Sequence, residues 1–148
     1  TNPSNQPVVF TVQLSAANEI PAAAAADANG TGTATITFSV PRDASGNVTG
    51  PGTWNVQANV SGVTSNSIIL SHIHTGASGV RGNVYVDTLL TAANAIPLNN
   101  GAGVVNFTGV PISQEQAQTV MNNPAGHYFN MHTPASPAGA VRGQLVRQ

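Results

Sequence analysis

Apolar and polar residues alternate along much of this chain, and a period of two predicts β-strands with one buried face. The first alternating segment places Phe10, Val12 and Leu14 on one face, with polar residues between them. Residues 33–40 and 54–60 repeat this pattern. The segments predicted as strands are residues 8–14, 33–40, 54–60, 68–74, 84–86, 105–107, 128–132 and 141–146.

One segment predicts a helix, because Ser113 is a candidate N-cap, Gln116 completes a capping box and Pro124 ends the pattern. Residues 15–29 are rich in alanine, but Pro21 and the glycines that follow predict a loop. Short strands separated by Gly- and Pro-containing turns predict an all-β, antiparallel β-sandwich of about eight strands with one short helix. A closed barrel is the alternative architecture.

The length of 148 residues fits a single domain, residues 8–148, preceded by a polar tail at residues 1–7. We expect this tail to be flexible and to follow a removed signal peptide, although a chain shortened in another way would look the same. Cysteine is absent, which excludes disulfides and thiolate metal sites but not export. We therefore expect an extracellular or periplasmic location.

Charged residues make up only 6% of the chain; lysine is absent, and the formal net charge is −1. The sequence has no basic patch that could neutralise phosphates, so we expect no nucleic-acid partner. No apolar run approaches the roughly 20 residues of a membrane span, so we expect none. No Ser-His-Asp arrangement or phosphate-binding loop is recognisable, and the sequence therefore leaves enzymatic activity open.

All four histidines lie in two passages, residues 72–75 and residues 127–133. In a strand, His72 and His74 project from the same face, and their parity with the preceding apolar residues predicts that they continue a row beginning in the core. Buried imidazoles need polar partners, and a shared metal ion would satisfy them together. We therefore predict that His72, His74 and His132 bind one metal ion, with ring nitrogens within roughly 4 Å of one another.

His127 is a fourth candidate ligand. It precedes His132 by five residues, so a regular strand turns it to the opposite face, with Phe129 and Met131, unless a β-bulge intervenes. A metal-free alternative also stands, in which the histidines are ordinary hydrogen-bonding residues of a structural or adhesive extracellular module.

Three further residues are predicted to support the site. Asn130 shares the parity of His132 and could orient a ligand ring. Arg81 and Arg142 each precede a glycine and a strand. We expect them to have a structural role, either pairing with Asp87 or donating to carbonyl groups of the loops that carry the histidines. The alternative is a functional role, in which an arginine guides an anion such as superoxide to the metal.

Three passages together resemble the CHRD domain, the module named after chordin. They are Leu-Ser-Ala-Ala-Asn-Glu-Ile-Pro at residues 14–21, the His-Ile-His-Thr-Gly passage at residues 72–76, and Tyr-Phe-Asn-Met-His-Thr at residues 128–133. The resemblance extends over about residues 8–146. It implies a Greek-key, immunoglobulin-like β-sandwich in an extracellular or periplasmic setting, and it indicates the fold more clearly than the function.

A looser resemblance is to the copper half-site of copper–zinc superoxide dismutase, in which a His-x-His pair and a later histidine bind copper. His72, His74 and His132 are similar in order and spacing, although this chain has no cysteine and no zinc-binding cluster after His74. Three neutral imidazoles suit copper or zinc. The resemblance and the affinity order favour copper, with zinc as the alternative. We therefore expect a copper-binding protein that is redox-active toward superoxide or carries copper or electrons.

Overall fold

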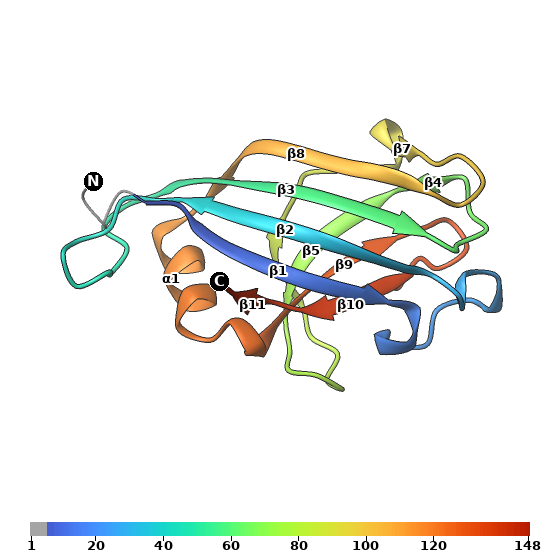
Figure 1. Ribbon diagram of the computed structural model, residues 1–148, viewed down its shortest axis with the longest axis horizontal. Helices are drawn as coiled ribbons and strands as arrows, with labels where there is room; N and C mark the ends of the chain where they lie inside the picture. The colour runs from blue at the N-terminus through green and yellow to red at the C-terminus, as the bar shows by residue number, and fades with distance from the viewer. Residues whose placement is uncertain (1–5) are drawn as a thin grey trace.

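The computed structural model describes residues 6–148, so residues 1–5 of the predicted tail lie outside the described part of the chain. The fold is all-β with one short α-helix, as the sequence predicts (Figure 1). No helix within residues 6–148 is long and apolar enough to cross a lipid bilayer. The strands are β1 (Val8–Ser15), β2 (Thr31–Ser39), β3 (Gly52–Ser61), β4 (Ser67–Ile68), β5 (Leu70–Thr75), β6 (Val84–Asp87), β7 (Ile96–Pro97), β8 (Gly103–Ile112), β9 (His127–His132), β10 (Val141–Gln144) and β11 (Val146–Arg147).

One antiparallel sheet with the order β6-β5-β9-β10-β1-β2-β3-β8 forms both layers of the fold. Strand β1 joins the layers, because it pairs with β2 along its whole length and with β10 at Ser15 and Arg142. Strand β11 also pairs with β1. In Figure 1, β1, β2, β3 and β8 lie in front of β5, β9 and β10. Strands β4 and β7 form a separate two-stranded ladder.

The core lies between the two layers. The first layer contributes fully buried aromatic rings, with Phe38 in edge-to-face contact with Phe10 at 5.0 Å and with Trp54 at 6.5 Å between centroids. The second layer contributes Ile73 from β5 and Phe129 from β9, both without exposed surface. Because side chains alternate between the two faces of a strand, the neighbours of Ile73 and Phe129 in β5 and β9 point to the outer face of the second layer.

Helix α1 (Gln114–Asn122) connects β8 to β9 at one end of the sandwich (Figure 1). Ser113 caps it as predicted: its hydroxyl accepts from the Gln116 N–H at 3.0 Å, and the Gln116 side chain accepts from the Ser113 N–H at 2.9 Å. The helix packs through the buried side chains of Ala117, Val120 and Met121.

The prediction that His72 and His74 continue an inward-facing row is wrong. Residues 68–74 are not one strand, because the chain breaks at Ile69, whose N–H donates to the His132 carbonyl at 2.9 Å. Before this break, the even-numbered Ile68 packs in the core, but after it the odd-numbered Ile73 faces the core. The two histidines consequently lie on the outer face of the second layer.

Candidate metal centre

Two neighbouring strands carry the histidine cluster on this outer face. Strand β5 holds His72 and His74, and the register of β5 with β9 places Leu70 opposite His132. All three imidazoles are buried, with exposed fractions of 6%, 7% and 5%. One ring nitrogen from each lies within 4.8 Å of the other two, slightly farther than the roughly 4 Å predicted. The structure thus brings the three predicted ligands together.

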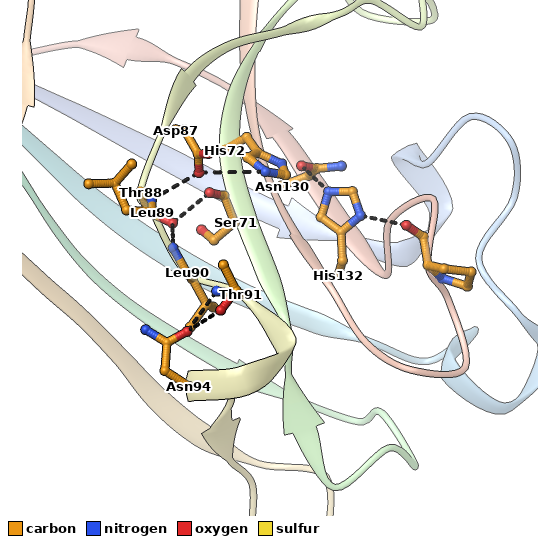
Figure 2. A network of polar contacts seen from close by, with 11 residues as sticks. Ser71, His72, Asp87, Thr88, Leu89, Leu90, Thr91, Asn94, Asn130 and His132 are labelled. Carbon is orange, nitrogen blue, oxygen red and sulfur yellow. Dashed lines mark hydrogen bonds and ion pairs between the residues drawn. The ribbon is translucent and has the colours of Figure 1, made fainter.

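Backbone carbonyl groups hold two of the rings through Nδ1. His74 Nδ1 lies 3.1 Å from the Gly82 carbonyl. His132 Nδ1 lies 2.9 Å from the Pro137 carbonyl, a contact drawn as a dashed line from His132 in Figure 2. A carbonyl oxygen only accepts hydrogen bonds, so in both rings Nδ1 carries the proton and Nε2 carries the lone pair. The Nε2 atom of His74 is buried and has no hydrogen-bond partner among the described residues.

The third ring is oriented differently. His72 Nε2 lies 3.7 Å from Asp87 Oδ1, on the adjacent strand β6, whereas His72 Nδ1 is buried without a partner in the described chain. The Leu89 N–H donates to the same Asp87 oxygen at 2.9 Å and steadies the carboxylate (Figure 2). These two atoms of His72 and Asp87 are too far apart for a hydrogen bond, but the nearby negative charge favours a proton on Nε2 and leaves the lone pair on Nδ1. His72 can therefore act as a ligand through Nδ1.

Asn130 lies beside His132, with Oδ1 3.0 Å from His132 Nε2. This is the nitrogen that would coordinate a metal, so Asn130 contacts the ring at the coordinating atom, and its predicted role in orienting a ligand ring stays a prediction. A neutral ring that donates from Nδ1 cannot also donate from Nε2. The amide orientation rotated by 180°, with the NH₂ group toward the ring, removes this conflict. It also turns Oδ1 toward Glu19, whose carboxyl oxygen lies 3.5 Å from the amide nitrogen and whose pKa burial raises to about 7.

Burial keeps all three imidazoles neutral. It is the main cause that lowers the pKa of His72 to about 4, and the neighbouring His132 adds to the effect, while Asp87 opposes it. Burial likewise lowers the pKa of His74 and of His132, against the effect of the hydrogen bonds that the two rings donate to the Gly82 and Pro137 carbonyls. The neutral ring is the form that coordinates metal ions, so no proton has to leave these rings near pH 7.

His127 does not belong to this cluster. It lies on β9 with the parity of Phe129 and Met131, without the β-bulge that would turn it toward His132. Its Nδ1 atom lies 2.8 Å from the Asn123 carbonyl, and its ring contacts Tyr85 at 5.6 Å between centroids.

Arg142 takes one of the two roles predicted for the arginines. Its buried guanidinium donates to the carbonyls of Ala77 at 2.9 Å and Val80 at 2.7 Å, in the loop that follows β5. The guanidinium carbon also lies 3.4 Å from the ring centre of Tyr128. The Tyr128 ring in turn stacks on the His74 ring, with 4.7 Å between the two centroids. Arg142 thereby positions the loop and the ring of one candidate ligand, and Asp87 contacts His72 instead of either arginine.

Arg81 differs from Arg142. Its side chain is exposed and makes no hydrogen bond or ion pair with another described residue. It lines a pocket of about 440 Å³ that opens over the three histidines. The other lining residues are Ile20, Leu70, Gly82, Asn83, Val84, Tyr128, Pro137 and Ala138.

The donor set fits a transition metal. Two buried ring nitrogens without partners, together with His132 Nε2 once a metal displaces the Asn130 amide from it, would offer three neutral nitrogen ligands beside an accessible pocket. The sequence could not indicate Asp87 or the Gly82 and Pro137 carbonyls as partners of the rings, because each reaches the site only through strand register or loop closure.

The family model for the CHRD domain matches residues 10–145 of the chain. This span contains every strand from β2 to β10 and all of the residues that surround the histidine cluster. No curated protein and no solved structure matches the chain.

Proposed function

The chain belongs to the CHRD domain family, and we propose that it is an exported protein that binds copper through His72, His74 and His132. The observation that carries the proposal is the cluster of three buried imidazoles, in which Nδ1 of His72 and Nε2 of His74 have no hydrogen-bond partners among the described residues. An unsatisfied buried polar atom costs about 1–3 kcal/mol, and coordination to a shared ion would remove this cost twice.

Copper is the proposed metal, with zinc as the alternative. The three candidate ligands are neutral imidazoles without a thiolate, a set that binds both metals and disfavours calcium and magnesium. Copper stands above zinc in the affinity order for nitrogen ligands. Three imidazoles can hold copper in both oxidation states, which would suit a carrier of copper or electrons or a centre reactive toward superoxide.

An extracellular or periplasmic location is part of the proposal. The CHRD domain is found in extracellular and secreted proteins. A chain without cysteine is compatible with an oxidising compartment, because it has no thiol that could form unwanted disulfides.

Titration of the metal-free protein with Cu(II), followed by calorimetry and EPR, tests the proposal. We expect one equivalent to bind, with nitrogen hyperfine structure, and His74→Ala or His132→Ala to weaken binding at least tenfold. His127→Ala is the matched control, because His127 is equally buried on the same strand as His132 but faces away from the cluster. No binding at all would favour a structural or adhesive module. An equal loss in His127→Ala would indicate a site of four histidines and would contradict the three-histidine site. Competition with Zn(II) distinguishes the two metals.

Activity toward superoxide is tested separately by stopped-flow decay of superoxide with the copper-loaded protein. We expect any rate to fall well below the diffusion-limited range of about 10⁸–10⁹ M⁻¹s⁻¹. Electrostatic steering needs local positive potential, and the pocket has one arginine in a chain of net charge −1. A rate no higher than that of buffer would favour a carrier of copper or electrons. A near-diffusional rate would contradict the expectation that the pocket has too little positive potential to steer superoxide.

A further inference from the structure

We propose, resting on the proposed metal site, that the pocket over the histidines binds a small organic anion with an apolar body, such as an aromatic carboxylate. The anionic oxygen would lie between the metal and the Arg81 guanidinium. The apolar body would pack against the wall formed by Ile20, Leu70, Val84 and Pro137.

The size of the pocket supports a ligand larger than a diatomic molecule. Its volume is about 440 Å³, whereas one water molecule occupies about 30 Å³ in the liquid. Pockets of about 300–1,000 Å³ are typical of sites that bind organic ligands and cofactors. A pocket built only to admit superoxide to a metal would not need this room.

The charge in the pocket selects an anion. Arg81 is the only formally charged residue among those that line it, and within residues 6–148 no carboxylate or carbonyl pairs with its guanidinium. Arg142, in contrast, is buried and donates from one guanidinium nitrogen to two carbonyls of the loop that precedes Arg81. One arginine therefore holds the pocket rim in place while the other remains available to a ligand. A guanidinium presents two parallel N–H donors that match a carboxylate.

The wall of the pocket selects an apolar body. Ile20 and Val84 are 37% and 50% exposed, and both line this pocket. They come from distant parts of the chain, the loop after β1 and the start of β6. Exposed apolar side chains gathered around a polar centre are typical of ligand-binding sites.

Binding of benzoate to the zinc-loaded protein tests the proposal, because zinc is redox-silent and calorimetry and NMR shifts report occupancy directly. We expect benzoate to bind with shifts confined to the pocket residues. Acetate, which has the charge without the ring, and benzyl alcohol, which has the ring without the charge, should each bind at least tenfold more weakly. The metal-free protein should bind benzoate at least tenfold more weakly as well.

Two variants separate the contributions of charge and wall. Arg81→Gln should weaken benzoate binding about tenfold and Val84→Ser should also weaken it, by at least threefold, while both keep zinc affinity within threefold because neither adds a charged ligand to the site. Arg147→Gln is the matched control, since Arg147 is an exposed arginine on β11 that does not line the pocket.

Zinc binding without any benzoate response would overturn this inference and leave the proposed metal site standing. Equal benzoate affinity with and without zinc would overturn the role of the metal in ligand binding. Failure to bind either metal would overturn the proposed function itself, and it is detected in the metal titration before benzoate is added.

Discussion

Replacing Glu19 by glutamine should make the metal-free protein more stable at neutral pH and leave its stability unchanged at pH 4.5. The Glu19 carboxyl is 6% exposed, and burial raises its pKa from 4.5 to about 7, although Asn130 and Arg142 oppose the shift. Between these values the folded protein keeps a proton on Glu19 that the unfolded chain has lost. Stability therefore falls as the pH rises through this window.

The magnitude follows from the size of the shift. A difference of 2.5 pKa units at about 1.36 kcal/mol per unit corresponds to about 3 kcal/mol in the free energy of unfolding between pH 4.5 and pH 8. The three clustered histidines act in the opposite direction, because burial lowers the pKa of each, that of His72 to about 4, so that stability rises with pH up to about 6.5. The wild-type curve therefore combines two opposing slopes, and Glu19→Gln removes only the first.

Urea unfolding of both proteins at half-unit intervals from pH 4.5 to pH 8, with EDTA present, measures the difference. EDTA matters because a bound metal would stabilise the folded state by mass action. Glu115→Gln is the matched control, since Glu115 is an exposed carboxylate on α1. If the wild-type and Glu19→Gln curves run parallel over this range, Glu19 is ionised in the folded protein and the burial argument is wrong.

Three further predictions concern the surroundings of the site. Arg142→Ala should lower the free energy of unfolding by about 3 kcal/mol in urea, because two buried hydrogen bonds to carbonyls are lost, whereas Arg81→Ala should change it by less than about 0.5 kcal/mol. Asp27→Asn should lower the free energy of unfolding by about 2–4 kcal/mol in the same assay. The buried Oδ2 of Asp27 accepts hydrogen bonds from the hydroxyls of Thr133 at 2.6 Å and Ser136 at 2.7 Å, and an amide NH₂ group in its place could not accept them. Gly82→Ala should weaken metal binding at least tenfold by calorimetry, since a Cβ at this position would overlap the Thr75 carbonyl oxygen and displace the Gly82 carbonyl that holds His74.

The strands of the first layer were predictable because each buries one face only. In β1, β2 and β3 every second side chain is buried, so the apolar rows identify both the strand and its inward face. Strand β9 is buried on both faces, and the apolar pattern there identifies a strand without showing which face meets the core. The same ambiguity applies around Ile69, where a backbone hydrogen bond to His132 interrupts the strand and reverses the parity of the residues after the break.

The three clustered histidines were predictable because a His-x-His pair on a strand and a third histidine before a matching threonine are visible as local patterns. Their partners were not. Asp87 meets His72 only because β6 pairs with β5, and Glu19 reaches Asn130 from a loop more than 100 residues away in sequence. The different roles of Arg81 and Arg142 were also hidden, because both precede Gly in similar sequences and only the closed loop buries one of them.

The strand order, which ends at β6 on one side and β8 on the other, has a consequence for aggregation. Edge strands expose unpaired backbone groups that can recruit another chain, and most proteins block them with charged side chains. This chain has few charges available for that purpose, but β6 is only four residues long. Strand β8 is interrupted by a register shift opposite Trp54 and Val56 and contains Pro111, which has no N–H to offer. Backbone shape, in place of electrostatic repulsion, thus limits edge-to-edge polymerisation of this nearly uncharged sheet.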